Sequence, residues 1–375
     1  MMLSRTFDPG VWGQVPFHFW SVTLFVFGCM VGSFLNVCIH RLPLGQSIVS
    51  PPSHCPHCKY SIPWYLNVPL ITWLTLRGKC RNCGAPISIR YFLVELLTGL
   101  MFLGCWLRFG PISASLALVY CLVLAGLIAA TFIDFEHFII PDEITIGGMV
   151  VGFICSFFFP GLHRSISVSM ALKQSLLGMA VGAGLIYLIV RVGKLVFGRH
   201  KVALPSETKI VFTETGVQLP DRAVPYDEIF YRQSDTITLR ARTVELVDRC
   251  YKNVVVRLSP ALLRIEEEQY NPETVPHLEA VSSEIVLPRE AMGFGDVKFM
   301  AAIGAFLGWK AVIFSLVVSS GIGSLVGLSL IAAGRRQARL AYGPYIAMAA
   351  VIWIFAGPQL LQWYQRLIGA SMGVA

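Results

Sequence analysis

Gly293-Phe294-Gly295-Asp296 marks the point where a charged segment ends and an apolar run begins, which continues to Trp309. Asp296 is therefore expected at the N-terminal mouth of a membrane helix, where a carboxylate is costly to desolvate and is a candidate functional group. The two glycines carry no Cβ atom and would let backbone or a peptide substrate approach the acid. The alternative interpretation of Asp296 is a simple helix cap.

The composition is that of a membrane protein. The 375-residue chain is 55% apolar and only 14% charged, whereas a soluble domain has about 25% charged residues. The apolar segments are too many for a signal peptide followed by a globular domain. We therefore expect an all-α polytopic membrane protein with about eight transmembrane helices. The expected spans are 17–39, 91–107, 112–133, 144–159, 171–190, 297–307, 311–333 and 345–361.

The placement of basic residues predicts the orientation. With the N terminus outside and the long insertion left aside, 15 Lys and Arg residues fall on the cytoplasmic side and six on the outer side. Cytoplasmic loops carry such an excess, so the net charge of +8 reflects membrane orientation and implies no nucleic-acid partner. We expect a multi-pass protein of the cytoplasmic (inner) membrane, in contact with the lipid bilayer. The oligomeric state cannot be predicted.

Five regions are expected along the chain. They are an N-terminal region with the first transmembrane helix (1–41), a cytoplasmic zinc-binding loop (42–90), helices two to five (91–198), an inserted soluble cytoplasmic domain (199–288), and helices six to eight preceded by the Gly-x-Gly-Asp motif (289–375).

Two Cys-x-x-Cys pairs separated by 21 residues predict a structural zinc site in the first loop. The expected ligands are Cys55, Cys58, Cys80 and Cys83. Disulfides are the alternative, but they are disfavoured in the reducing cytoplasm, and a redox motif would need only one pair. His54 and His57 are spare ligand candidates. The remaining six cysteines, at 29, 38, 105, 121, 155 and 250, are interpreted as small apolar filler.

A second acid accompanies Asp296 in the expected topology. Asp134 follows the unbroken apolar run of the third span, so both aspartates should lie at the cytoplasmic membrane boundary. Pro141 breaks the chain, and Asp142 is expected to cap the fourth span. Glu136 lies two residues from Asp134 and would point to nearly the opposite face of a helix. The sequence therefore favours Asp134 and Asp296 as a catalytic acid pair.

Two further polar residues fall inside expected spans. Glu95 lies four residues into the second span, where pairing with a neighbouring helix and lining a site are both open. Asn36 lies near the inner end of the first span and would cap it or bond to another helix. Small residues at Gly178/Gly182 and Gly323/Gly327 are expected to permit close packing of helices.

The segment 199–290 differs from the rest of the chain, since it holds 15 of the 22 acidic residues. Alternating apolar residues at 236–242 and 254–258 indicate half-buried strands, with Lys252-Asn253 as a plausible turn. We expect a small, mainly-β cytoplasmic domain. A disordered linker is disfavoured because the segment is rich in Val, Ile and Leu.

Taken together, these stretches resemble the bacterial prepilin peptidases, the type IV leader peptidase family. The resemblance covers most of the chain except 199–288 and is specific in combination, although each piece alone is not. It rests on residues 32–36, 41–43, the two Cys-x-x-Cys pairs, 64–70, 86–91, 94–98, Ile133-Asp134, Pro141-Asp142 and 293–298. Two departures are the long segment 199–288 and Leu340-Ala341-Tyr342, where the family often has Ile-Pro-Phe.

The resemblance implies a membrane aspartyl endopeptidase. Such enzymes cleave the basic leader from type IV prepilins and type II secretion pseudopilins at the cytoplasmic face, then methylate the new N-terminal residue with S-adenosylmethionine. The family's catalytic pair maps onto Asp134 and Asp296, with Gly293, Gly295, Lys298 and Glu95 as supporting candidates. The methyl-donor residues are not indicated.

Other function classes stay open at this point. A transporter or proton relay also places acids in membrane helices, but it favours internal repeats, which are not evident here. A non-enzymatic assembly scaffold would need the acids only as caps. Another intramembrane aspartyl protease, of the presenilin-like kind, shares the Gly-x-Gly-Asp string but not the cysteine loop.

Overall fold

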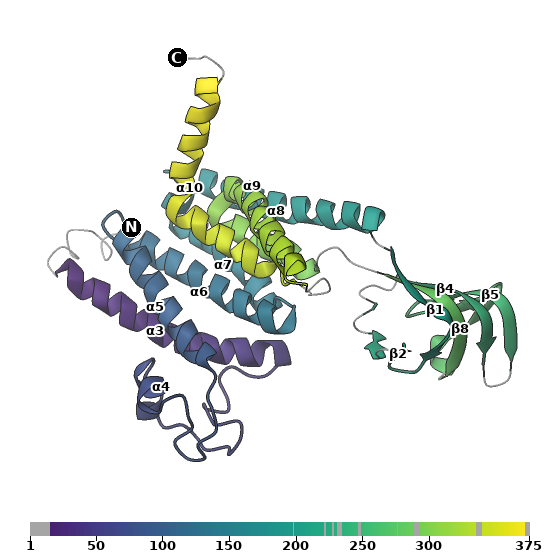
Figure 1. Cartoon of the computed structure of the whole chain (residues 1–375). Helices are drawn as coiled ribbons and strands as arrows, with labels where there is room; N and C mark the ends of the chain where they lie inside the picture. Colours follow the sequence, from purple (N-terminus) through teal and green to yellow (C-terminus); the bar gives the residue numbers. More distant parts are fainter. Residues whose placement is uncertain are drawn as a thin grey trace. The chain divides into compact units, whose positions relative to one another are not determined.

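The computed structural model describes residues 16–197, 199–220, 223–226, 229–230, 235–246, 249–275, 277–288, 293–334 and 340–371. The chain divides into two compact units, a helical one formed by residues up to 186 and from 294 onward, and one formed by 187–293 that carries a β-sheet (Figure 1). Five arginines counted for the orientation lie outside the described residues: Arg5, Arg289, Arg335, Arg336 and Arg339.

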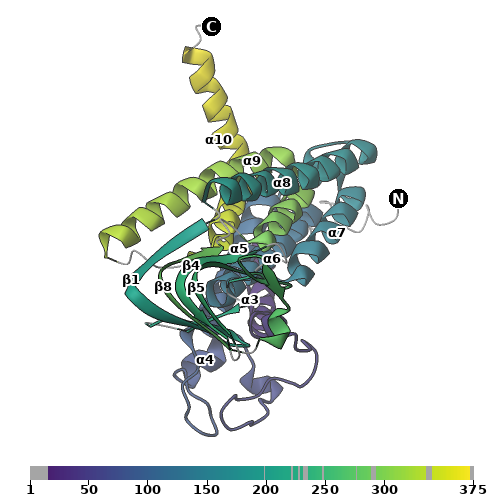
Figure 2. The same ribbon diagram turned by 90° about the vertical axis from the view of Figure 1, so that its right-hand side faces the viewer.

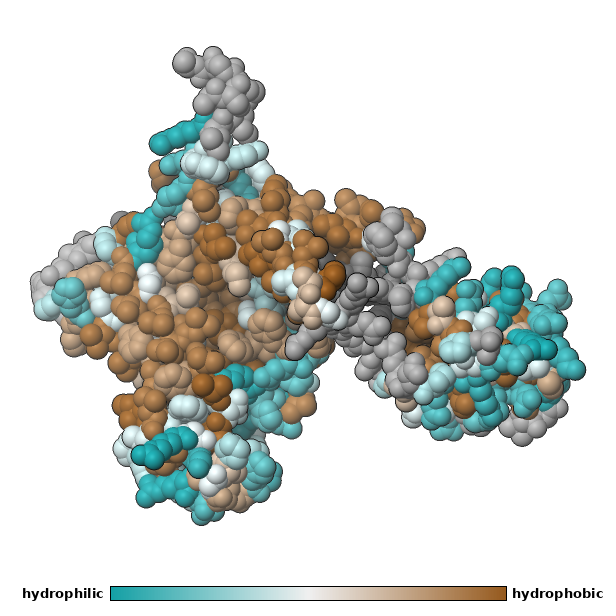
Figure 3. Space-filling view, viewed as in Figure 1, coloured by the Kyte–Doolittle hydropathy of each residue, from teal (hydrophilic) through white to brown (hydrophobic). Residues whose placement is uncertain are grey.

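Long apolar helices make up the first unit. They are α3 (Phe17–Arg41), α5 (Ile89–Phe109), α6 (Ala114–His137), α7 (Asp142–Phe158), α8 (Val168–Phe197, whose last residues belong to the second unit), α9 (Phe294–Ala332) and α10 (Gly343–Ser371). Shorter pieces lie between them: η1 (Leu42–Leu44), η2 (Trp64–Leu66), α4 (Ile71–Thr75) and η3 (Pro160–His163). Apolar residues cover the visible face of the helices, while hydrophilic residues cover much of the loop around α4 (Figure 3).

Within the described residues, six helices are long and apolar enough to cross a membrane: α3, α5, α6, α8, α9 and α10. This count does not test the expectation of about eight spans, because it treats two places differently. Helix α7 has only 17 residues. The expected sixth and seventh spans correspond to the two helices that meet at Gly308 and are counted together as α9.

Helix α9 reverses direction at Gly308, whose φ of 77° and ψ of 172° are not helical. Gly295, at the start of α9, lies against Ile140. Further along α9, the Ser319 hydroxyl lies 2.8 Å from that of Tyr342. Tyr342 is followed by Gly343, which also lies against Ile140. A straight helix would separate residues 295 and 319 by about 36 Å. The two parts of α9 therefore fold back toward the same end of the unit.

Small residues let the helix backbones approach closely. A Cβ atom at Gly178 would lie 2.1 Å from the Gly304 carbonyl oxygen, and one at Gly182 would lie 2.5 Å from that of Met300, so α8 packs directly on the first part of α9. The expected role of this glycine pair is confirmed. The pair at Gly323 and Gly327 meets only ordinary contacts at 3.5 Å or more, so the expected close packing is wrong there.

The second unit contains an eight-stranded antiparallel sheet in the order β3-β2-β1-β8-β4-β5-β6-β7 (Figure 2). Its strands are β1 (Arg199–Phe212), β2 (Gly216–Gln218), β3 (Ala223–Pro225), β4 (Ile237–Glu245), β5 (Cys250–Leu258), β6 (Leu263–Ile265), β7 (Glu268–Tyr270) and β8 (Leu278–Pro288), with the short helix η5 (Pro272–Thr274) before β8. Buried residues alternate along β4, at Ile237, Leu239 and Ala241, and they join an apolar core. A separate β domain, as expected, is present.

Two expectations about this domain are wrong. The pair Lys252-Asn253 lies inside β5 and is no turn; β4 and β5 are instead connected after Glu245, where the Leu246 N–H donates to the Arg249 carbonyl at 2.8 Å. Asn253 nevertheless has a positive φ of 57°, which is the local irregularity that its sequence signals. Cys250 is exposed and is therefore not apolar filler.

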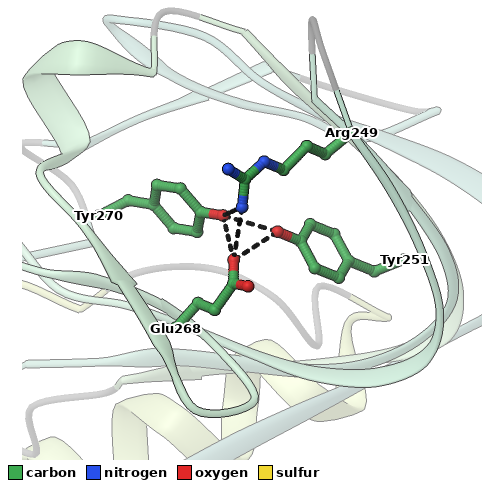
Figure 4. Close-up of polar contacts among 4 residues, drawn as sticks. All are labelled: Arg249, Tyr251, Glu268 and Tyr270. Carbon is green, nitrogen blue, oxygen red and sulfur yellow. Dashed lines mark hydrogen bonds and ion pairs between the residues drawn. The ribbon is translucent and has the colours of Figure 1, made fainter.

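A polar cluster joins β5 to β7 (Figure 4). The Tyr251 hydroxyl donates to Glu268 at 2.6 Å and lowers the pKa of that carboxyl, and Arg249 pairs with Glu268 at 3.1 Å. The hydroxyls of Tyr251 and Tyr270 lie 2.6 Å apart. Because Arg249 and Glu268 are both about half exposed, this ion pair adds little stability.

Candidate active site and metal centre

Asp134 lies in the last turn of α6 and is 6% exposed. Helix α6 ends at His137; the next residue, Phe138, has a positive φ of 55° that stops the helix, and its N–H donates to the backbone carbonyl of Asp134. The Asp134 carboxylate accepts a 2.9 Å hydrogen bond from the N–H of Gly343, the first residue of α10. This hydrogen bond from the N-terminus of α10 positions the Asp134 carboxylate.

Asp296 lies in the first turn of α9 and is 8% exposed. The neighbouring Gly295 lies against Ile140, because an added Cβ would be 3.5 Å from the Ile140 nitrogen. Ile140 also faces the start of α10, since a Cβ at Gly343 would lie 3.1 Å from Ile140 Cδ1 and 2.7 Å from Asp134 Oδ2. The end of α6 and the starts of α9 and α10 therefore meet around Ile140. This junction brings the helix ends that carry the two aspartates together.

One of the supporting candidates, Lys298, lies at the edge of this junction. Lys298 Nζ lies 2.6 Å from Asp142 Oδ1 and 5.5 Å from the centre of the Phe294 ring, so it ties the start of α9 to the start of α7. Gly293 lies exposed just before α9. Asp142 is the first residue of α7 and makes no capping hydrogen bond, so the expectation that it caps this helix is wrong.

Glu95 lies elsewhere, beside the cysteine loop. It is buried, and its Oε2 accepts the Leu70 N–H at 2.8 Å. Leu70 has a φ of 61°, an uncommon conformation for a residue with a side chain, and it precedes α4. The Glu95 carboxylate therefore anchors the loop to α5, and it does not join the two aspartates.

The four predicted cysteine ligands come together. Their sulfur atoms all lie within 4.8 Å of one another, with Cys55 and Cys83 at 3.8 Å and Cys58 and Cys80 at 4.0 Å. A tetrahedral zinc ion with Zn–S bonds of about 2.3 Å separates its sulfur ligands by about 3.8 Å. The set therefore fits a four-thiolate metal ion, while disulfide sulfurs would be bonded at about 2.0 Å.

Both Cys-x-x-Cys segments fold into the same turn. In the first, the Lys59 N–H donates to the Cys55 carbonyl and the Cys55 N–H to the Tyr60 carbonyl, each at 2.9 Å. In the second, the Gly84 N–H donates to the Cys80 carbonyl at 2.9 Å and the Cys80 N–H to the Ala85 carbonyl at 2.8 Å. The residue after each second cysteine has a positive φ, 58° at Lys59 and 72° at Gly84. This repeated geometry directs two sulfurs from each turn toward one centre.

Polar neighbours favour the thiolate form at two of the four cysteines, Cys58 and Cys80. The Asn82 amide donates to Cys58 Sγ at 3.6 Å and is the main cause that lowers the pKa of Cys58 to about 6. Backbone N–H groups of Cys83 and Asn82 lower the pKa of Cys80. At Cys83 the Ala85 backbone lowers the pKa, but burial and the neighbouring cysteine sulfurs outweigh it and raise the pKa to about 11, so this ligand would release its proton on metal binding.

Reasoning from the sequence missed two residues of the aspartate junction, Ile140 and Gly343. Gly343 is 209 residues from its partner Asp134, and Ile140 is one of many apolar residues in this part of the chain. Gly343-Pro344 does carry a local signal, because proline is common in the first turn of a helix. That signal places the start of α10 but gives no indication of what it contacts.

Two family models match the chain. "Bacterial Peptidase A24 N-terminal domain" matches residues 26–109, and "Type IV leader peptidase family" matches 121–204 and 275–328. The first match contains the four cysteines and Glu95, while the second contains both aspartates. Most of the sheet, 205–274, lies outside both matches.

Curated relatives are similar over different shares of their length. A Prepilin leader peptidase/N-methyltransferase of Myxococcus xanthus is 44% identical over 217 residues, which cover 58% of this chain and 60% of the relative. A protein of the same name from Dichelobacter nodosus is 35% identical over 50% of this chain and 71% of the relative. One from Aeromonas hydrophila is 27% identical over 93% of this chain and 95% of the relative. No solved structure matches the chain.

Proposed function

The chain belongs to the type IV leader peptidase family, and from this premise we propose that it cleaves the leader from type IV prepilins and type II secretion pseudopilins and methylates the new N-terminal residue. The names of its relatives join these two activities. The observation that carries the proposal is the meeting of the helix ends bearing Asp134 and Asp296 around Ile140.

We assign the peptidase chemistry to Asp134 and Asp296. Both carboxylates are nearly buried, and both lie near helix N-termini that stabilise a negative charge. Two neighbouring carboxylates do not both ionise easily, so the pair holds one proton and titrates as a unit.

The ionised carboxylate takes a proton from a water molecule, which attacks the scissile carbonyl carbon. The protonated carboxyl donates to the carbonyl oxygen. Collapse of the tetrahedral intermediate then breaks the C–N bond and releases the new N-terminal amine, which takes up a proton. No covalent bond between enzyme and substrate is needed.

The location of the pair suits a substrate that lies partly in the membrane. Asp134 ends the apolar helix α6 and Asp296 starts the apolar helix α9, so both lie at a membrane boundary. The excess of basic residues supports our proposal that this boundary is the cytoplasmic face of the inner membrane. A prepilin could then keep its apolar helix in the bilayer while its charged leader stays in the cytoplasm.

We further assign the four cysteines to a structural zinc ion. Four thiolates complete a tetrahedral shell and leave no position for water or substrate, so the ion would hold the loop in shape and take no part in bond breaking.

S-adenosylmethionine is the methyl donor that the second activity requires. When bound, it supplies an electrophilic methyl group, such that an N–C bond forms as a C–S bond breaks, a thioether is left and the amine loses a proton. The buried Asn36, Arg41 and Glu95, which share one cavity, fit such a charged donor.

Incubation of the purified full-length protein with a prepilin-like peptide tests this function. Mass spectrometry would follow leader loss and the added methyl group separately. We expect cleavage at one bond followed by methylation. A transporter or an assembly scaffold would leave the peptide intact, so an intact peptide with a folded protein would contradict the proposal.

A further inference from the structure

A cavity of about 450 Å³ lies between the cysteine loop and the ends of α3 and α5. Ser33, Asn36, His40 and Arg41 of α3 line it, as do Tyr91 and Glu95 of α5. The loop completes the wall and brings Cys55 and Cys80 of the metal centre to it. Asp134, Asp296 and Gly343 are not among its lining residues. The cavity is therefore a second site, of a size that accommodates a small-molecule ligand.

Asn36 leaves a hydrogen-bond acceptor unused in this cavity. The side chain is only 1% exposed, and its Nδ2 donates to the Tyr91 carbonyl at 3.0 Å. Its Oδ1 has no hydrogen-bond partner in the part of the chain that the structure describes. A buried acceptor without a partner is destabilising. A ligand with an N–H group would satisfy it.

Arg41 brings a buried positive charge to the same cavity. The residue is 8% exposed, and its guanidinium donates to the carbonyls of Ser47 at 3.0 Å and Pro51 at 2.7 Å. These carbonyl groups are neutral, and Arg41 forms no ion pair with any acidic residue among those described. The charge is thus hydrogen-bonded but not neutralised.

Glu95 brings a buried carboxyl group to the same cavity. It accepts the Leu70 N–H and likewise forms no ion pair with a described basic residue. A Cβ at Gly32 would lie 2.7 Å from the Glu95 Cα, so the absence of a side chain there lets α3 press Glu95 into place. Buried charges that lack a counter-ion are costly. A ligand that carries both signs of charge would offset the cost at Arg41 and at Glu95.

We propose that this cavity is the binding site for S-adenosylmethionine, an inference that rests on the proposed methylation. The methionine end of this ligand has a carboxylate for Arg41, and its ammonium and sulfonium groups suit Glu95. Its N–H donors suit Asn36 Oδ1. The rings of Tyr60, Trp73 and Tyr91, which also line the cavity, offer faces for an adenine base and for a cation.

This assignment gives the cysteine loop a role in methylation. The loop supplies part of the cavity wall, so a metal ion that orders the loop also shapes the donor site. The two reactions use separate sites, with cleavage at the aspartate junction and the methyl donor bound beside the loop.

Binding of S-adenosylhomocysteine, which keeps the nucleoside and amino-acid parts of the donor, tests the assignment directly. Isothermal titration calorimetry on the detergent-purified full-length protein would compare wild type with Asn36→Leu and Val37→Phe, a substitution that fills the cavity. We expect Asn36→Leu to weaken binding about 10-fold, since one hydrogen bond is lost, and Val37→Phe to weaken it at least as much. Val26→Phe on the same helix is the matched control, because Val26 is exposed and lies outside the cavity; it should bind as wild type.

A second measurement uses only the wild-type protein, so its result does not depend on whether the variants fold. Ultraviolet crosslinking of labelled S-adenosylmethionine should mark peptides within residues 33–95, and mass spectrometry would identify them. Label confined to peptides outside 33–95, or unchanged binding in both cavity variants, would overturn the assignment. The assignment would also be overturned if the cavity variants lost affinity for the cleaved pilin peptide but kept their affinity for S-adenosylhomocysteine. Leader cleavage and methylation by wild type, measured in parallel, report the proposed function separately.

Discussion

Replacing Gly343 with alanine should impair cleavage without unfolding the protein. The added Cβ would lie 2.7 Å from Asp134 Oδ2, whereas carbon and oxygen atoms in contact stay about 3.3 Å apart, so the carboxylate must move by about 0.6 Å. Ile140 Cδ1, at 3.1 Å from the same position, limits the room for compensation. Misplacement of a catalytic group by about 1 Å costs roughly 100-fold, so we expect kcat for leader cleavage to fall about 10- to 100-fold.

Stability should change little in this variant, because replacing glycine with alanine restricts the unfolded chain and so stabilises the fold by about 0.4–1 kcal/mol, which offsets part of the strain. The assay is a time course of leader loss from a prepilin peptide, with thermal unfolding measured on the same preparation. Gly126→Ala in α6 is the matched control, since a Cβ there meets no atom within 4 Å. If Gly343→Ala cleaved as fast as wild type, the contact between α10 and Asp134 would have no part in the chemistry.

Three further outcomes are expected. Elemental analysis should find one zinc ion per chain in wild type and none in Cys80→Ser. In that variant methylation should fall at least as much as cleavage. A metal-free protein with full activity would exclude the zinc site. Replacement of 199–288 by a flexible linker should leave cleavage of a minimal peptide intact, because this segment contains no residue of the aspartate junction; loss of turnover in a folded protein would assign the sheet a catalytic role. Asp142→Asn should reduce cleavage only several-fold, because it weakens the pairing with Lys298 and leaves both aspartates in place, and a loss comparable to that of Asp134→Asn would contradict this.

The sequence was sufficient to predict the elements whose signals are local. The two Cys-x-x-Cys pairs predicted a centre that the structure brings together, and alternation at 236–242 predicted β4. Asp134 and Asp296 were chosen because each adjoins an apolar run at the same expected boundary. The structure places them at adjoining helix ends.

What could not be predicted depends on contacts between distant parts of the chain. The sequence separates two spans at Gly308-Trp309-Lys310, but it does not show that the chain reverses direction there. Near this reversal the Ser175 hydroxyl donates a hydrogen bond to the Ala305 carbonyl at 2.9 Å, and this contact likewise depends on the packing of α8 against α9. The cavity brings together Arg41 and Glu95, which are 54 positions apart, and no pattern in the sequence indicates that they line the same site.

Cleavage by the aspartate variants tests the central claim most directly. Asp134→Asn and Asp296→Asn keep nearly the same shape, but asparagine can neither act as a base at neutral pH nor share a proton. Mass spectrometry of one prepilin peptide should show that each variant loses cleavage by orders of magnitude, and that the double variant is little worse, because groups that act as a unit are not additive. A folded preparation of either single variant that still removes the leader at a substantial rate would contradict the assignment of this chemistry to the aspartate pair.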